Sequence, residues 1–372
     1  MTMALINLRL GRVFSVIAAL LFGIAFLYMV SMNKASRDMA ENGYGEPLLK
    51  FGVFSDVQYA DIDNKMNFEQ TRMRYYRDSK YKVKRLMHKW NNEEPVKFVL
   101  NLGDLIDGQA RRKAKSEDCL KELIKCFKEF SGNIYHVWGN HDFYNFKRDR
   151  LMMNHDLNSA YAIRRGVISP EGTANAPEDK GYYSFVAHPK LRIIMMDHFE
   201  FSALGRDKDD QVYVRALAFL TSRNKNDDLN SSDGLHGFDT RFAKYNGGPS
   251  AEQLLWLESQ IQEAANDKQY VIVAGHAPAN IEATVPHCLL WNYQAVLEVL
   301  KPYKNVIAYL AGHDHRGGYA VDANGVHHLT INGLVEADPG TLDCATFNLY
   351  EDKLVVQGSG QVLSFQIELP VL

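Results

Sequence analysis

Residues 306–315 read VIAYLAGHDH, an apolar run that ends at a glycine and is followed by His-Asp-His. A short apolar run with a turn signal at its end predicts a buried β-strand. The glycine, which has no Cβ, allows the tight turn that aims the next side chains at one point. Imidazole and carboxylate donors at the end of a strand predict a metal site at that edge of an α/β sheet.

Four more strand ends upstream have the same character. Apolar runs at 48–54, 96–102, 134–138 and 270–274 are followed by Asp56-Val57-Gln58, Gly103-Asp104, Gly139-Asn140-His141-Asp142 and Gly275-His276. One such motif alone predicts little, but all five in this order are very improbable by chance. The candidate metal ligands are therefore Asp56, Gln58, Asp104, Asn140, His276, His313 and His315.

The donor types also indicate the kind of centre. A pair of divalent cations about 3.5–4 Å apart needs a carboxylate between the ions, and Asp104 is suited to that place. Mixed carboxylate, imidazole and amide donors suit manganese, iron or zinc better than calcium. Taken singly, Asp56 and Asp104 could instead be helix N-caps, and His276 and His313 could be ordinary hydrogen-bonded histidines. The joint occurrence of all five motifs favours the metal site.

The spacing of apolar residues predicts an α/β protein. Helical patterns at 69–90, 117–130, 251–264 and 292–300 alternate with the strands, to which 191–196 adds another. Such alternation predicts β-α units with largely parallel strands in a mixed sheet. Closely spaced strand candidates at 326–331, 345–350 and 353–357 predict a second, more antiparallel sheet packed on the first. The stretches 145–180 and 207–249 are irregular, and loops of that length are usually functional or disordered.

Composition limits the classes of protein that the chain can belong to. Its 372 residues are enough for one large domain or two ordinary ones, and 46% hydrophobic residues supply a sizeable core. A formal net charge of -3 gives no basic footprint for nucleic acid. Four cysteines without CxxC spacing predict neither a disulfide scaffold nor a structural zinc site.

The N-terminus differs from the rest of the chain. Residues 13–32 contain no charged side chain and are flanked by basic residues on both sides. This length matches the roughly 20 apolar residues that span a bilayer, and it predicts an N-terminal apolar helix that serves as a single-pass membrane anchor. A cleaved secretory signal and a buried core helix are the alternatives. Residues 33–47 are predicted to be a linker, so that 1–47 precede a folded domain at 48–372.

The five motifs resemble those of the calcineurin-like metallophosphoesterase superfamily, whose pattern is D-x-H, GD, GNHD/E, GH and GHxH. The chain departs from this pattern at Gln58, where most members have histidine. The D-x-Q form within FSDVQYAD (54–61) resembles the manganese-dependent ADP-ribose/CDP-alcohol diphosphatases. Further stretches of this kind are NFEQTRMRYYRDS (67–79), LGDLIDG (102–108), WGNHDFYNFKRD (138–149), the segment 229–248 and CLLWNY (288–293). The resemblance covers residues 51–332 and leaves out the apolar N-terminus.

This resemblance implies a four-layer α-β-β-α sandwich with two divalent metal ions, manganese first and magnesium or another divalent cation as alternatives. One ion would be held by Asp56, Gln58, Asp104 and His315, and the other by Asp104, Asn140, His276 and His313. The implied reaction is hydrolysis of the phosphoanhydride of ADP-ribose or of CDP-choline, CDP-ethanolamine or CDP-glycerol. Its products are a nucleoside monophosphate and a phosphorylated sugar or alcohol.

The resemblance also bears on residues beside the metals. We expect His141 to stabilise charge on the phosphoryl group or to protonate the leaving oxygen, with Asp142 or another carboxylate orienting its ring. A structural histidine is the alternative. Phe68, Leu229 and Cys288 match substrate-contacting stretches of the family, although each of them could be an ordinary core residue.

Two other functions compete with this one. The first is a generic metal-dependent phosphomonoesterase or phosphoprotein phosphatase on the same scaffold, and the second is a membrane-tethered scaffold without catalysis. We expect a monomer that binds a small nucleotide diphosphate and no nucleic acid. The domain would be membrane-anchored on a side that the sequence leaves open, or cytoplasmic if 13–32 is not a functional anchor.

Overall fold

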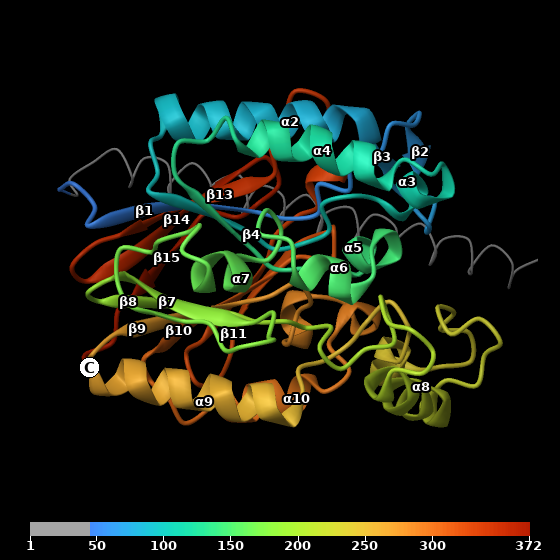
Figure 1. The fold of residues 1–372 in the computed structure, drawn as a ribbon. Coiled ribbons are helices and arrows are strands. Elements are labelled where there is room, and N and C mark those ends of the chain that lie inside the picture. Colours follow the sequence, from blue (N-terminus) through green and yellow to red (C-terminus); the bar gives the residue numbers. More distant parts are fainter. Residues whose placement is uncertain (1–44) are drawn as a thin grey trace, which may run out of the picture.

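The computed structural model describes residues 45–372, which fold around two β-sheets packed face to face (Figure 1). The first sheet has the strand order β15-β14-β13-β1-β4-β5. Its strands are β1 (Leu49–Phe54), β4 (Phe98–Asn101), β5 (Asn133–His136), β13 (Cys344–Leu349), β14 (Lys353–Ser359) and β15 (Phe365–Glu368).

The second sheet has the order β11-β12-β10-β9-β8-β7-β6. Its strands are β6 (Ala174–Asn175), β7 (Tyr183–His188), β8 (Leu191–Met195), β9 (Tyr270–Ala274), β10 (Val306–Ala311), β11 (Gly318–Val321) and β12 (His327–Thr330). A small hairpin, β2 (Lys65–Met66) and β3 (Met73–Arg74), stands apart from both sheets.

Helices cover the outer face of each sheet (Figure 1). The longer helices are α2 (Tyr76–His88), α4 (Ser116–Phe127), α8 (Gln211–Arg223), α9 (Ala251–Asn266) and α10 (Tyr293–Leu300). The shorter ones are α3 (Gly108–Arg112), α5 (Asn140–Asn145), α6 (Arg148–Met152) and α7 (Ser159–Arg164), with the single turns η1 (Lys89–Glu93), η2 (Gly237–Arg241), η3 (Ile281–Ala283), η4 (Pro286–Cys288) and η5 (Leu334–Glu336). The predicted mixed α/β class is thus confirmed.

Three apolar layers hold this arrangement together. Between the sheets, the ring of Phe51 stacks on Phe347 and on Phe98 with centroid distances of 4.8 and 5.1 Å. A second cluster joins the first sheet to α2 and α4, and a third joins the second sheet to α9 and α10. Burial of apolar surface on both faces of each sheet explains why the central strands read as continuous hydrophobic runs.

Two sequence predictions about this architecture are wrong. The C-terminal strands do not build a separate sheet. Strands β13 to β15 join β1 in antiparallel fashion, and β11 and β12 extend the sheet of β10. The parallel strands are in turn divided between both sheets, because β1 pairs with β4 whereas β8 pairs with β9. Local patterns fix the strands, but which strands become neighbours depends on contacts distant in sequence.

The helix predicted at 69–90 begins later than expected. Residues up to 74 form the β2–β3 hairpin, where the Asn67 side chain accepts hydrogen bonds from the backbone of Thr71 and Arg72. This local Asx turn competes with helix formation. Helix α8, within the irregular stretch 207–249, begins where the Asp210 side chain caps the backbone N–H groups of Val212 and Tyr213.

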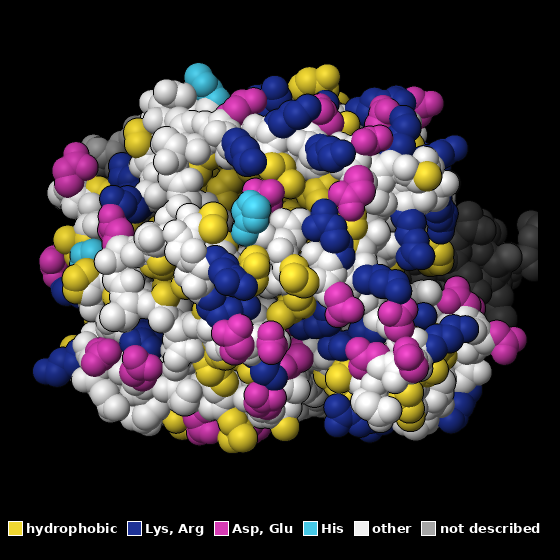
Figure 2. Space-filling model, viewed as in Figure 1, with side chains coloured by type: hydrophobic (Ala, Val, Ile, Leu, Met, Phe, Trp, Pro, Cys, Tyr) yellow, Lys and Arg dark blue, Asp and Glu magenta, His cyan; other side chains and the backbone are white. Residues whose placement is uncertain are grey.

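The predicted apolar helix at 13–32 lies outside the described residues. Within residues 45–372, the structure contains no helix with the length and apolar character that crossing a membrane requires. All four cysteines lie in the described part, where each is buried and free. On the face drawn in Figure 2, basic and acidic side chains are interspersed.

The fold positions the site through its parallel strands. Strands β1, β4 and β5 run parallel in one sheet, and β9 and β10 run parallel in the other. The loops after their carboxyl ends meet across the two sheets, as the hydrogen bond from the backbone N–H of His313 to Asp56 Oδ2 shows (3.0 Å). All five motifs therefore converge at one edge of the sandwich.

Candidate active site

The backbone of the converging loops is held in an unusual conformation. Asp56, Gln58, Asp104 and His313 have φ angles of 54°, 40°, 57° and 68°. Eight non-glycine residues within 45–372 have positive φ, and these four are half of them. Each such residue costs about 1–3 kcal/mol, and such strain clusters where surrounding structure enforces a functional geometry. Inter-loop hydrogen bonds such as Asp56 N to Gly103 O (3.1 Å) supply that enforcement here.

One glycine of the motifs is required by packing around Asp104. A Cβ placed on Gly139 would overlap the Asp104 carboxylate and approach the His276 ring. The glycine before Asn140 therefore lets the loop after β5 pass against the aspartate of the loop after β4.

His276 is oriented by a backbone carbonyl behind its ring. Its Nδ1 donates a hydrogen bond to Leu102 O (2.7 Å), which leaves the lone pair on Nε2. That lone pair points to Asn140 Oδ1 at 3.2 Å and to His313 Nδ1 at 3.1 Å. His276 is fully buried, so no bulk water can mediate between these atoms.

His313 is oriented in the same way by Asn246. The Asn246 Nδ2 group donates to Arg241 O and His287 O, so its Oδ1 faces the imidazole as an acceptor. His313 Nε2 therefore donates to Asn246 Oδ1 (2.7 Å) and leaves the lone pair on Nδ1. Burial, and next to it the neighbouring His276, lowers the pKa of His313 well below its ordinary value.

These orientations bring three electron pairs together without a proton between them. Asn140 Oδ1, His276 Nε2 and His313 Nδ1 all point to one place. Facing acceptors in a buried site repel one another unless a cation lies among them. The donor set of two imidazoles and an amide oxygen fits a transition-metal ion such as manganese or zinc.

A second cluster also requires positive charge. His315 Nδ1 lies 2.8 Å from Glu336 Oε1, and its Nε2 lies 3.3 Å from Asp56 Oδ1. Burial opposes protonation of this ring, but the carboxylates of Glu336 and Asp56 outweigh it and raise the pKa of His315 to about 9. Burial would likewise keep Asp56 neutral, yet His315 lowers the pKa of Asp56 far below its ordinary value. A bound metal ion would supply the positive charge that the proton on His315 supplies to Asp56 and Glu336 here.

Unpartnered oxygen atoms lie where such a cation would bind. Asp56 Oδ1 and Gln58 Oε1 are buried and accept no hydrogen bond. The other end of the Gln58 amide, Nε2, is 2.9 Å from Asp104 Oδ2 and 3.0 Å from His315 Nε2. The unpartnered oxygen atoms of Asp56 and Gln58 can serve as metal ligands, and they fit an ion between Asp56, Gln58, Asp104 and His315.

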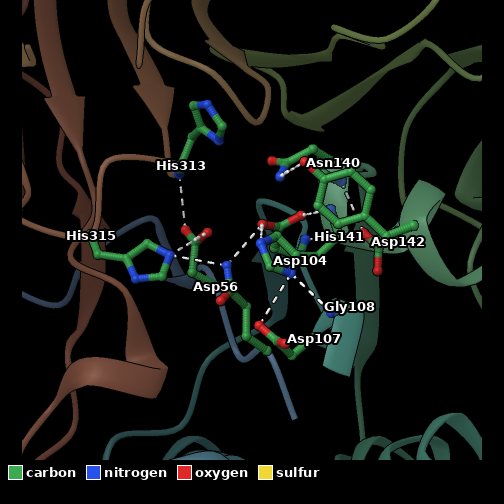
Figure 3. A network of polar contacts seen from close by, with 12 residues as sticks. Asp56, Asp104, Asp107, Gly108, Asn140, His141, Asp142, His313 and His315 are labelled. Carbon is green, nitrogen blue, oxygen red and sulfur yellow. Dashed lines mark hydrogen bonds and ion pairs between the residues drawn. The ribbon is translucent and has the colours of Figure 1, made fainter. Parts of the chain in front are cut away.

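Asp104 lies between Asp56 and His315 on one side and Asn140 on the other (Figure 3). Its Oδ2 is 3.6 Å from His276 Nε2 on one side and 2.9 Å from Gln58 Nε2 on the other. Ligand atoms of Asp56, Asp104 and His276 all lie within 4.8 Å of one another. The structure thus brings together all seven predicted ligands, with Asp104 in the position of a bridge.

The profile of the calcineurin-like phosphoesterase family matches residues 49–317. The chain therefore belongs to the calcineurin-like phosphoesterases.

Relatives of this phosphoesterase define the resemblance more narrowly. This chain is 39% identical over 324 residues to the manganese-dependent ADP-ribose/CDP-alcohol diphosphatase of Xenopus tropicalis, with 85% of this chain and 93% of the relative covered. The diphosphatase of the same name from Bos taurus is 38% identical over 318 residues, with the same coverage. A dimetal phosphatase from Danio rerio superposes with a TM-score of 0.80 at 36% identity, covering 87% of this chain and 100% of that one. The predicted resemblance to the diphosphatases is thus confirmed.

His141 of the phosphoesterase lies at the edge of the cluster, with its Nε2 4.0 Å from Asp104 Oδ2. Its Nδ1 lies 3.1 Å from the backbone N of Gly108 and 3.2 Å from Asp107 Oδ2. Burial alone would lower the pKa of His141, but the carboxylates of Asp104 and Asp107 outweigh it and raise that pKa. The ring therefore presents a proton toward the centre of the site.

The carboxylate beside the His141 ring is Asp107, whereas Asp142, named first in the sequence expectation, has other contacts. Its carboxylate accepts hydrogen bonds from the backbone N–H groups of Asp104 (3.0 Å), Leu105 (3.0 Å) and Gly139 (2.9 Å). Asp142 thereby ties the loop after β5 to the loop after β4. Its hydrogen bonds thus hold the backbone around the candidate ligands Asp104 and Asn140.

The three expected substrate residues differ in their surroundings. Phe68, in the hairpin loop, is 99% exposed and is therefore no core residue. Cys288 is buried at the end of η4, and Leu229 packs against a small cluster with Phe242 and Trp291. Leu229 O accepts the N–H of Lys244, and the ring of the next residue, Tyr245, is 5.9 Å from His313. The loop of Leu229 thus reaches the metal ligands.

Sequence reasoning missed the residues behind the ligands. Glu336, Asp107 and Asn246 contact His315, His141 and His313 respectively. None of them stands in one of the five motifs. Asp107 and Asn246 do lie within stretches that resemble the diphosphatases, and that resemblance was the one available signal.

Proposed function

We propose that this chain hydrolyses the phosphoanhydride of ADP-ribose or of a CDP-alcohol such as CDP-choline, CDP-ethanolamine or CDP-glycerol. The products are a nucleoside monophosphate and a phosphorylated sugar or alcohol. The observation that carries the proposal is the cluster of facing lone pairs on Asn140, His276 and His313 next to Asp104. The printed names of the Xenopus tropicalis and Bos taurus relatives support the substrate class and manganese as the metal.

In this proposal, Asp56, Gln58, Asp104 and His315 hold one cation, and Asp104, Asn140, His276 and His313 hold the other. When bound, two divalent cations supply Lewis acidity and an activated water for in-line displacement at phosphorus. Manganese is the first choice, and magnesium or another divalent ion is the alternative.

Side chains of the protein then position the substrate and supply the proton for the reaction. Asp104 would be shared by the two ions, and its negative charge would screen their mutual repulsion. His141 directs its Nε2 proton to the phosphoryl group or to the leaving oxygen, while Asp107, whose Oδ2 lies 3.2 Å from Nδ1, holds the charged ring from behind. General acid catalysis of this kind contributes about 10²–10⁴-fold to a rate.

The nucleotide part of the substrate is assigned to Phe68, Leu229 and Cys288. The exposed ring of Phe68 offers a face on which a base can stack, which is consistent with its position in a loop at the rim. Replacement of Phe68 by Ala should raise KM for ADP-ribose and leave KM for p-nitrophenyl phosphate unchanged, since the latter has no base.

The chain is organised as a catalytic domain at 48–372 preceded by a hydrophobic segment and linker at 1–47. Residues 13–32 attach this domain to a membrane as a single-pass anchor, and the protein acts as a monomer. Fractionation of cells with protease protection tests both the attachment and the side on which the domain lies. Recovery of the full-length chain entirely in the high-speed supernatant would exclude the anchor.

A substrate panel tests the activity itself. Initial rates with ADP-ribose, CDP-choline and p-nitrophenyl phosphate are compared in manganese and in magnesium. Preference for the two diphosphates in manganese is expected, with a nucleoside monophosphate as a product. Preference for the monoester would favour a phosphomonoesterase, and bound metal without turnover of any of the three would favour a non-catalytic scaffold.

A further inference from the structure

Arg74, the last residue of β3, contacts two buried carboxylates at once. Its Nε donates to Glu336 Oε1 at 3.0 Å, and its Nη1 lies 3.7 Å from Asp107 Oδ2. The Glu336 and Asp107 side chains are 2% and 3% exposed, whereas that of Arg74 is 19% exposed. The arginine thus places positive charge beside both acids.

Each of these acids has a second contact, and the second contact is a functional imidazole. Glu336 Oε1 is 2.8 Å from Nδ1 of His315, a ligand of the first cluster of donors around Asp56. Asp107 Oδ2 is 3.2 Å from Nδ1 of His141. This Asp107 oxygen is buried and accepts no hydrogen bond, while the other oxygen, Oδ1, accepts the backbone N–H of Gln109 (2.8 Å).

The chemistry of arginine suits this place. The guanidinium is planar and always charged, and its donors point in fixed directions, so one side chain can reach two acceptors on different elements. A lysine ammonium is a point charge on a flexible stem and cannot hold both contacts with the same geometry. Without the guanidinium, each buried carboxylate would keep only the imidazole on its other side as a charged partner, which is unfavourable.

The surrounding backbone fixes both ends of the contact. The N–H of Tyr75, next to Arg74, donates to Val335 O (2.8 Å), and Lys82 Nζ donates to Leu334 O (3.2 Å). These bonds attach the turn η5, which contains Glu336, to α2 and to the residue before it. The guanidinium of Arg74 therefore links the β2–β3 hairpin to the turn of Glu336 and to the loop of Asp107.

The other end of the same hairpin faces the substrate side. Phe68 and Glu69 lie in its loop, and Glu69 is within 3.7 Å of His287 and within 3.8 Å of Arg316. His287 precedes Cys288, and Arg316 follows His315. One hairpin thus connects the rim where we place the base to the residues behind the two imidazoles.

We propose that Arg74 is a positioning residue that acts on His315 through Glu336 and on His141 through Asp107. Its guanidinium sets the ring of a metal ligand and the ring of the proton donor relative to each other. The catalytic half of this proposal, through His141, rests on the proposed function, whereas the half that acts on His315 requires only a bound cation.

The experiment compares Arg74→Met and Arg74→Lys with Glu336→Gln and Asp107→Asn in the full chain. Arg77→Met is the matched control, because Arg77 lies three residues on and pairs at the surface with Asp61 and Asp63. Manganese affinity is measured by calorimetric titration of the metal-free chain, without substrate. Values of kcat and KM for ADP-ribose are then measured at saturating manganese.

Arg74→Met should weaken manganese binding by about 10–100-fold, the range typical of residues that orient metal ligands. It should also lower kcat at saturating manganese by about tenfold with KM nearly unchanged, since a displaced proton donor acts on the chemical step. Arg77→Met should change neither value.

Double variants separate the two routes. In the Glu336→Gln background, Arg74→Met should weaken manganese binding no further, and in the Asp107→Asn background it should lower kcat no further. Arg74→Lys should restore manganese affinity, because Glu336 is the nearer acid, while kcat stays low. If Arg74 had only a structural role, Arg74→Lys would restore both manganese affinity and kcat, or neither of them.

Three outcomes would overturn the proposal: wild-type manganese affinity in Arg74→Met, full additivity in the double variants, or equal recovery of both values in Arg74→Lys. If Arg74→Met does not fold, Arg74→Lys and its double variants decide the question. If the wild-type chain hydrolyses no nucleotide diphosphate, the proposed function fails, and the calorimetric series still tests the route through Glu336 to His315.

Discussion

His276 Nε2 and His313 Nδ1 lie 3.1 Å apart, and the hydrogen bonds behind the two rings use the only proton that each neutral ring has. Leu102 O and Asn246 Oδ1 are the acceptors that fix this arrangement. Such a pair is unfavourable in a site without a cation and favourable once a cation lies between the nitrogens. The fold therefore stores electrostatic repulsion that metal binding relieves.

Manganese should consequently stabilise the protein against unfolding. An ion at 100 times its Kd adds about 2.7 kcal/mol to the free energy of unfolding if it binds only the native state. Thermal unfolding with manganese and with excess EDTA measures this increment. His313→Ala should reduce the increment, whereas His155→Ala, at an exposed histidine paired only with Asp156, should leave it unchanged. Equal increments in both variants would contradict the assignment of His313 as a ligand.

Gln58→His should change how firmly one ion is held. An amide oxygen is a weaker donor than imidazole, so the natural glutamine leaves its ion more exchangeable and more Lewis-acidic. The variant should retain more manganese after dialysis and turn over more slowly per bound ion. Metal analysis by mass spectrometry together with initial rates measures both effects.

Gln70→His is the control for backbone strain in that comparison. Gln70 has a φ of 58°, similar to the 40° of Gln58, but lies in the hairpin loop, where its side chain donates to Asn67 O. Its replacement should leave manganese retention unchanged. If both variants altered retention alike, the effect of Gln58→His would come from strain instead of from the new ligand.

His141→Ala should separate catalysis from metal binding. The imidazole lies 4.0 Å from Asp104 Oδ2 and presents its Nε2 to the site, while its hydrogen bond is to the backbone of Gly108 and not to a candidate ligand. Turnover should fall by about 10²–10⁴-fold while manganese content stays at the wild-type level. Turnover close to wild type would remove His141 from the mechanism, and His88→Ala at an exposed site serves as the control.

The comparison of sequence and structure shows where local patterns suffice. The strand ends were predictable because apolar runs and glycines are local signals, and all seven candidate ligands follow directly from them. The distribution of strands over two sheets was not predictable in this way. The pairing of Leu49 with Leu349 joins positions at opposite ends of the domain, and no local pattern encodes that register.

The residues behind the ligands illustrate a second limit. Glu336 follows His315 by 21 positions and contacts it only because β11, β12 and the turn η5 bring the chain back. The sequence suggested Asp142 or another carboxylate as the partner of His141, and Asp107 lies 34 positions earlier in the chain. Only the path of the backbone decides that Asp107 faces the ring and that Asp142 faces three N–H groups.

Asp142→Asn should therefore act on stability first. The carboxylate accepts three buried N–H groups, and an amide in its place would turn a donor toward at least one of them. A buried N–H left without an acceptor costs about 1–3 kcal/mol, so the free energy of unfolding should fall by that amount. Urea denaturation in saturating manganese measures the loss, with the exposed Asp149→Asn in α6 as the control. Should Asp142→Asn keep the wild-type free energy of unfolding but lose turnover, Asp142 would act on His141 after all, and the three backbone contacts would not be its main role.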